Sequence, residues 1–249
     1  MIMIKICGSA LIMTLFALTA QSQVVLDFNF TGVNSPVPPG NQLGPVTATS
    51  TLSTNLSVAD GFQPFGLGPP VVADSIAAES SGAGGQGPDE MSLRGFGENG
   101  LATAITANDY AFFSVNIGSG YQMDLDTISF NIRRNGNAAP EDYAILASPS
   151  GFTASSELQT FEVTTSSSSP LTNVETLSVD VSSLATYDGL TGNDVEFRLY
   201  AWGSGVGNFH VSDASLSGQI AVIPEPSTFA LLASGIGVVL LGSRRRRKS

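Results

Sequence analysis

Cysteine and histidine are almost absent from this chain of 249 residues. Cys7 is the single cysteine and His210 the single histidine. One thiol cannot form an intrachain disulfide, and beyond residue 22 no thiol remains as a nucleophile or a metal ligand. The usual ligands of catalytic zinc are therefore missing, and so is the side chain most often used in acid–base catalysis. We expect a protein that is not an enzyme, with His210 as an ordinary strand residue.

Positive charge is also scarce away from the two ends of the chain. Of the ten lysines and arginines, one is Lys5 and five form a run at 244–248. The region between them carries four arginines against all 21 aspartates and glutamates, a formal net charge of −17. A surface this acidic repels phosphate backbones, so the composition excludes DNA and RNA as partners.

The first 22 residues have the layout of a secretory signal peptide. Lys5 provides the positive start, residues 8–20 form an uncharged and largely apolar run, and Ala20-Gln21-Ser22 offers small residues before a cleavage point. We predict cleavage after Ser22, with Ala20 as the alternative. The rest of the chain is therefore expected to be exported.

The end of the chain carries three features in a fixed order. Pro224-Glu225-Pro226 comes first, an uncharged apolar run follows at 227–243, and the cations Arg244, Arg245, Arg246, Arg247 and Lys248 come last. A bilayer needs about 20 apolar helical residues and at least about 17, so we expect a single transmembrane helix at 227–243. The cations hold the C-terminus in the cytoplasm. The prolines favour extended backbone around Glu225, which a processing enzyme can bind.

This order and spacing resemble the PEP-CTERM sorting signal of bacterial surface and exopolysaccharide-associated proteins. The resemblance rests on Pro224, Glu225 and Pro226, the Ser-Thr pair after them, the apolar run and the arginine tail. It implies recognition by exosortase, a membrane-embedded cysteine transpeptidase-like enzyme that cuts near the motif and transfers the protein. The alternative is an ordinary C-terminal anchor. We assign 223–249 to a sorting segment that anchors the chain transiently before it reaches the cell surface or the extracellular space.

Between these segments, residues 23–222 show the alternation of β-strands. The clearest run is 194–202, in which Val195, Phe197, Leu199 and Ala201 share one face. No helical pattern of convincing length and no fixed-period repeat is present. We expect one secreted domain, an all-β antiparallel β-sandwich of jelly-roll-like type. The predicted strands are 24–30, 46–58, 91–96, 111–117, 127–133, 143–147, 161–163, 177–181, 194–202, 209–211 and 215–222.

Three side chains on one strand are candidates for ligand binding. Tyr200 and Trp202 share the outward face of 194–202 with Arg198. Rings on an exposed sheet face stack on sugars, and an arginine beside them fixes hydroxyl groups. The alternative is that a second sheet or a long loop covers this face.

An oxygen-rich loop is the candidate for a metal. It contains Asp188, Asn193 and Asp194, residue types that suit Ca²⁺. The spacing is not that of an EF-hand, and the same residue types more often shape turns. We expect no cofactor other than Ca²⁺.

The sequence thus predicts a cell-surface or extracellular-matrix protein, a structural or adhesive component associated with exopolysaccharide and biofilm. The alternative is a carbohydrate-binding module that uses the exposed rings. A secreted hydrolase is the least favoured class, because neither a nucleophile motif nor a distinctive carboxylate pair stands out.

Overall fold

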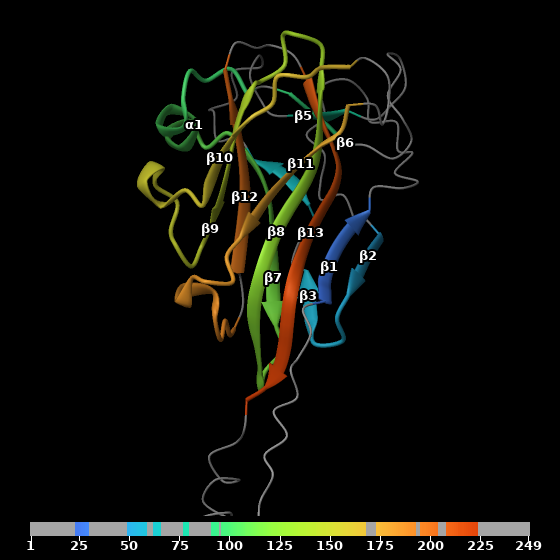
Figure 1. The fold of residues 1–249 in the computed structure, drawn as a ribbon, viewed down its shortest axis with the longest axis vertical. Coiled ribbons are helices and arrows are strands. Elements are labelled where there is room, and N and C mark those ends of the chain that lie inside the picture. The colour runs from blue at the N-terminus through green and yellow to red at the C-terminus, as the bar shows by residue number, and fades with distance from the viewer. Residues whose placement is uncertain are drawn as a thin grey trace, which may run out of the picture.

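A computed structural model describes residues 23–29, 49–58, 62–65, 77–79, 91–94, 96–167, 173–192, 195–203 and 208–223. Within these residues, two antiparallel β-sheets pack face to face (Figure 1). The predicted all-β antiparallel sandwich is therefore confirmed. The predicted signal peptide, transmembrane helix and basic tail lie outside the described residues. In the part that the structure describes, no helix is long and apolar enough to cross a bilayer.

Two long strands form the middle of the seven-stranded sheet. β8 (Tyr121–Asn135) and β13 (Asn208–Val222) pair antiparallel along their whole lengths and lie side by side in Figure 1. β8 has one outer neighbour, the edge strand β11 (Glu175–Asp180). β13 pairs on its other side with β1 (Gln23–Asn29), which pairs with β2 (Thr49–Leu52), and with β6 (Met91–Arg94), which pairs with β5 (Ala77–Glu79).

The strand β13 is continuous where the sequence predicted two strands, 209–211 and 215–222. Its pairing with β8 shifts between Val211 and Asp213 and again between Ser217 and Gly218. The first irregularity leaves Ser212 of β13 without a cross-strand pairing partner and moves the buried positions from 209 and 211 to 214 and 216, so the sequence pattern looks like a break. At the second, the extra residue lies on β8, and the alternation of β13 continues. A Cβ atom at Gly218 would lie 2.2 Å from the carbonyl oxygen of Asp124. Only glycine fits this close approach of the two long strands.

The six-stranded sheet is centred on β12 (Val195–Trp202), which lies between two neighbours. Val195, Phe197, Leu199 and Ala201 are all buried against the other sheet, as the alternation predicted. The remaining strands are β9 (Asp142–Ala147) with β10 (Gln159–Glu162) on one side, and β7 (Tyr110–Ile117) with β3 (Leu56–Val58) and β4 (Gln63–Phe65) on the other.

The segment 46–58 also differs from its prediction as one strand. Its described part, 49–58, forms β2 and β3, which belong to different sheets. A turn at 53–55, in which the amide of Leu56 donates to the carbonyl of Ser53, carries the chain from one sheet to the other. This short turn closes one edge of the sandwich.

Aromatic rings fill the space between the sheets. Phe113 lies 4.9 Å from Phe28 and 5.1 Å from Phe197 between ring centroids, so the rings of both sheets interlock. Phe62 and Phe130 complete this cluster. Buried rings contribute large apolar areas, which a domain without disulfides needs for its stability.

A short helix that the sequence analysis did not predict lies on the outer face of the six-stranded sheet. α1 (Leu101–Ala107) is followed by Asn108, whose φ of 61° is left-handed and ends the helix. Leu101, Ala104 and Ile105 lie on one helical face and pack against the sheet. Two single turns, η1 (Ala154–Ser156) and η2 (Ala185–Tyr187), lie in loops.

Candidate functional site

The face that carries Tyr200 and Trp202 is covered. Both rings point away from the main core, but their exposed fractions are only 0% and 9%. Helix α1 packs on them through Leu101, Ala104 and Ile105, forming a second, smaller hydrophobic cluster. The expectation of an exposed Tyr200–Trp202 platform is therefore wrong. The alternative of a covered face is correct, although the cover is a helix.

Arg198, the third predicted ligand-binding residue, lies at the border of this cluster. Its Nε donates to Oε1 of Glu196 at 2.5 Å, and its Nη1 donates to the hydroxyl of Tyr200 at 3.1 Å. The guanidinium carbon lies 3.6 Å from the ring centroid of Phe152 and 4.1 Å from that of Tyr110. Such cation–π contacts stabilise a guanidinium by about 0.5–2 kcal/mol each. The arginine is therefore fixed between two rings.

Burial and hydrogen bonds shift the pKa values of Tyr110, Tyr200 and Arg198 in this cluster. Burial raises the pKa of Tyr110 to about 12 and also raises the pKa of Tyr200. Burial alone would lower the pKa of Arg198, but its hydrogen bonds to Tyr200 and Glu196 raise it overall. Both tyrosines are therefore neutral, and Arg198 is charged, at physiological pH.

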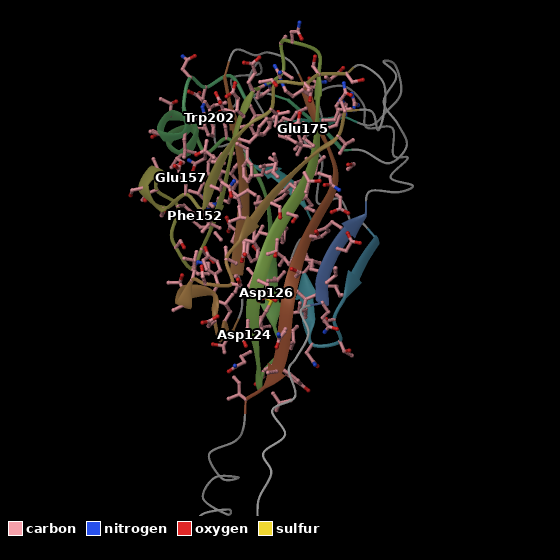
Figure 2. The ribbon with its side chains drawn as sticks, in the orientation of Figure 1. Asp124, Asp126, Phe152, Glu157, Glu175 and Trp202 are labelled. Carbon is pink, nitrogen blue, oxygen red and sulfur yellow. The ribbon has the colours of Figure 1, made fainter. Side chains whose placement is uncertain are left out.

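Two partly exposed rings flank this arginine, and sequence reasoning missed both. Phe112 on β7 lies directly opposite Arg198 in the sheet. Phe152 comes from the loop after β9 and lies on the same flank of the molecule as Trp202 (Figure 2). The alternation of 111–117 signals that Phe112 faces outward. Nothing in the sequence signals Phe152, because a loop residue has no periodicity.

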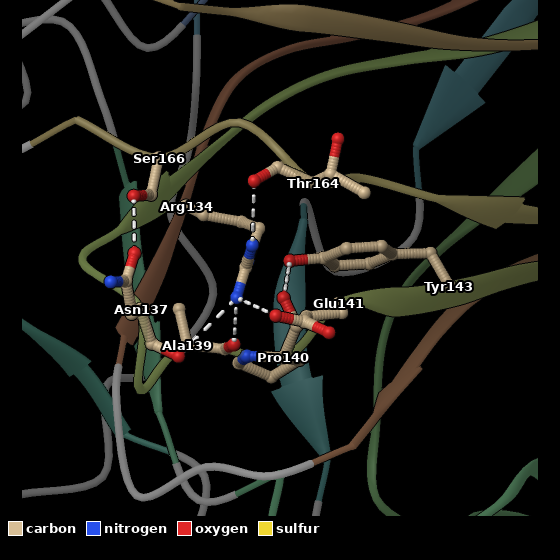
Figure 3. Close-up of polar contacts among 8 residues, drawn as sticks. All are labelled: Arg134, Asn137, Ala139, Pro140, Glu141, Tyr143, Thr164 and Ser166. Carbon is tan, nitrogen blue, oxygen red and sulfur yellow. Dashed lines mark hydrogen bonds and ion pairs between the residues drawn. The ribbon is translucent and has the colours of Figure 1, made fainter.

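The buried Arg134 side chain is the centre of a cluster of polar contacts (Figure 3). Its Nη2 donates to Oε1 of Glu141 at 2.8 Å and to the carbonyl of Ala139 at 2.9 Å, and its Nη1 donates to the carbonyl of Thr164 at 3.2 Å. Nearby, the hydroxyl of Tyr143 donates to the carbonyl of Pro140 at 2.9 Å. These bonds join the loop after β8 to the segment after β10. The arrangement is structural, since carbonyl oxygens hold the guanidinium.

Arg133 and His210 lie on the face of the seven-stranded sheet opposite to that of Arg134. They are cross-strand partners on β8 and β13, and both are buried. Nη1 of Arg133 donates to the carbonyl of Ser167 at 2.5 Å. Arg133 and Arg134 thus hold one segment, 164–167, from two sides. His210 lies on strand β13, as predicted.

A carboxyl pair lies on the outer face of the seven-stranded sheet. Asp213 on β13 and Asp27 on β1 are neighbours on this face, and the proximity of the two carboxyl groups favours a proton on Asp213. Burial, a hydrogen bond to Asp27 and the negative charge of Asp27 raise the pKa of Asp213 to about 7. Oδ1 of Asp27 is buried and has no hydrogen-bond partner in the described part of the chain.

The calcium candidates are only partly described. Asp188 is exposed, and Asn193 and Asp194 lie outside the described residues. Asp124, on β8 near Asp126 in Figure 2, accepts a hydrogen bond from the amide of Gly189 at 2.6 Å. Here a carboxylate shapes the turn. Among the described residues no group of three acidic, histidine or cysteine side chains is placed to hold a metal, and Ca²⁺ binding stays a prediction.

The end of the chain provides the decisive comparison with known proteins. The profile of the PEP-CTERM protein-sorting motif matches residues 222–248. This chain carries a PEP-CTERM sorting motif. The matched range contains Pro224, Glu225 and Pro226 together with the apolar run and the basic tail. The PEP-CTERM motif indicates export and sorting to the surface, and it implies processing by an exosortase.

Outside the PEP-CTERM motif, similarity to known proteins is weak. A search of curated proteins gives no match. Among solved structures, a xylan-binding module CBM15 is 15% identical with a TM-score of 0.36, and covers 66% of this chain and 97% of its own. The CBM22-1 xylan-binding domain of Paenibacillus barcinonensis Xyn10C is 11% identical with a TM-score of 0.35, covering 79% and 95%. A carbohydrate-binding module of family 29 is 11% identical with a TM-score of 0.36, covering 80% and 90%. Scores this low assign no function to this chain.

Proposed function

We propose that this protein is a structural or adhesive component of the cell surface or extracellular matrix, associated with exopolysaccharide in biofilms. The PEP-CTERM motif at 222–248 carries the proposal, because it directs an exported chain to the surface. The sandwich is the part that stays outside the cell after processing. Its strongly acidic composition keeps it soluble there.

The domain acts through contact with other matrix components and needs no cofactor for this role. The chain offers a single histidine, and that side chain is buried in strand β13. A general base must reach the proton that it removes, and a buried strand residue is poorly placed for that. We therefore propose that the protein is not an enzyme.

Mass spectrometry of the surface-released protein tests the processing step. In a host with an exosortase, the released protein is expected to lack the peptide at 244–248. In a host whose exosortase gene is deleted, the full chain is expected to stay in the membrane fraction. A variant with all five tail cations replaced by glutamine is expected to be retained and oriented poorly, because those charges hold the C-terminus inside.

Recovery of an intact tail from released protein would contradict the processing step.

The matrix role has a separate test, in which a strain lacking the protein is compared with the parent for adherent biomass. The deletion strain is expected to adhere less, and the full chain is expected to restore adhesion. A chain that ends at residue 223 serves as the control and is expected not to restore it. Unchanged adhesion in the deletion strain would contradict the matrix role.

Carbohydrate binding is the second candidate function. The observation that favours it is the pair of partly exposed rings, Phe112 and Phe152, beside the Arg198–Glu196 ion pair. Binding surfaces for small ligands combine aromatic side chains with a few fixed polar groups. This candidate is compatible with surface delivery, because a matrix protein is surrounded by polysaccharide.

A further inference from the structure

We propose that the outer face of the six-stranded sheet binds a neutral sugar residue of an extracellular polysaccharide. The site consists of Phe112, Phe152, Glu196 and Arg198, and we call it the arginine platform. This inference rests on the proposed function, because surface delivery brings the site into contact with polysaccharides. It replaces Tyr200 and Trp202, which α1 covers, with rings that water reaches.

The apolar part of the arginine platform is aromatic. Phe112 and Phe152 are each partly exposed, and they come from strand β7 and from the loop after β9. The face of an aromatic ring carries partial negative charge. The C–H groups on one face of a sugar ring are weakly positive and apolar, so they pack on such a surface.

The polar part of the arginine platform offers both donors and acceptors. A guanidinium has five N–H donors, and Arg198 uses one on Glu196 and one on Tyr200. Among the described residues, no acceptor meets the other three donors or pairs with Oε2 of Glu196. The two side chains are 16% and 23% exposed. A sugar hydroxyl both donates and accepts, so neighbouring hydroxyls match this pair.

The arginine platform is ordered before any ligand arrives. The guanidinium carbon of Arg198 lies 3.6 Å from the ring centroid of Phe152 and 4.1 Å from that of Tyr110, and Nη1 donates a hydrogen bond to the hydroxyl of Tyr200. An arginine that is already fixed loses little side-chain entropy on binding. The cost of ordering, about 0.5–1.5 kcal/mol for a long side chain, is therefore largely avoided.

Charge selects a neutral sugar over an acidic one. Glu196 neutralises Arg198, so the arginine platform has no net charge to attract a carboxylate or a sulfate. Around it, the region between the two targeting segments carries a formal net charge of −17. An acidic polymer is repelled by this field, whereas a neutral polymer is not.

Affinity electrophoresis and titration calorimetry with the full chain in mild detergent test this proposal. The probes are a soluble β-glucan, a xylan and a glucomannan as neutral polymers, with alginate as the acidic one. We expect binding to at least one neutral polymer and none to alginate. The proposal would be overturned if the protein bound none of the three neutral polymers, or if it preferred alginate.

Two substitutions locate the binding to the arginine platform. Phe152→Ala removes one ring, and Arg198→Lys keeps the charge but loses the planar donors that lie between the rings. Each is expected to weaken binding to the neutral polymer at least about tenfold, which corresponds to about 1.4 kcal/mol. Phe152→Tyr keeps an aromatic ring and is expected to bind within about threefold of wild type.

A matched control is Tyr121→Ala, which removes a partly exposed ring from β8 in the other sheet. It is expected to bind like the wild type. If Phe152→Ala and Arg198→Lys also bind like the wild type, the arginine platform is not the site.

Emission from Trp202, the only tryptophan, reports whether each variant keeps the cluster folded. Surface delivery of the same variants is scored separately, so a chain that is delivered but binds no polymer refutes only this inference.

Discussion

The carboxyl pair between β1 and β13 makes stability depend on pH near neutrality. Because the pKa of Asp213 is raised to about 7 in the folded chain, the folded state holds a proton that the unfolded state has released. This contribution to stability is fully present below the ordinary aspartate value of 3.8 and is lost as the pH rises through about 7. Above about pH 7 the charged Asp213 carboxylate is repelled by the negative charge of Asp27. Replacing Asp213 with asparagine removes this repulsion and keeps a donor for Asp27.

The size of the effect follows from the shift. A rise from 3.8 to about 7 corresponds to roughly 4 kcal/mol at about 1.4 kcal/mol per pKa unit. Since the pair is partly exposed, water and salt screen it, and we expect about 1–2 kcal/mol. At pH 8, Asp213→Asn is therefore expected to raise the melting temperature by about 2–8 °C for a domain of this size. At pH 4 the variant and the wild type are expected to melt alike.

Thermal and urea melts of the surface-released protein between pH 4 and pH 9 provide the assay. The control is Asp180→Asn on β11, because hydrogen bonds from Ser182 lower the pKa of Asp180. That carboxylate stabilises the fold above its ordinary pKa, so this control is expected not to gain stability at pH 8. If Asp213→Asn melts at or below the wild-type temperature at pH 8, or keeps the wild-type pH dependence, the shared proton does not exist.

Two further predictions concern the core and the buried arginine, and denaturant melts measure both. Phe197→Ala is expected to cost about 3–5 kcal/mol, because a fully buried ring leaves a cavity, while Glu196→Ala on the outer face costs at most about 1 kcal/mol. A larger loss from Glu196→Ala would show that the faces of β12 are assigned backwards. Arg134→Met is expected to cost about 3–5 kcal/mol, because it leaves buried carbonyl groups without donors. Glu141→Gln is expected to cost about 1 kcal/mol or less, since that side chain is 48% exposed, and equal losses from the two would contradict the carbonyl-centred cluster.

Sequence patterns predicted the strands well where a strand has one buried and one outward face. Phe197 and Leu199 are buried because an inward position recurs at every second residue. The same reasoning was wrong where the period shifts. The bulge near Asp213 shifts the buried positions by one residue, so the single strand β13 looked like two strands in the sequence.

The sorting function was determined by the sequence alone. Pro224-Glu225-Pro226, an apolar run and a basic tail act through their order along the chain, which needs no tertiary contact to be recognised. The composition was likewise known from the sequence, since the scarcity of cysteine and the excess of carboxylates do not depend on folding.

Which face of the domain is open was decided only by the tertiary structure. Alternation placed Tyr200 and Trp202 outward, but it contains no information about a segment 100 residues away that packs on them. Leu101, Ala104 and Ile105 form the cover because seven residues between two strands fold into a helix whose apolar side meets those rings. Likewise, Phe152 reaches Arg198 from a loop. Local periodicity reports the direction of a side chain, whereas its exposure depends on distant elements that share no pattern with it.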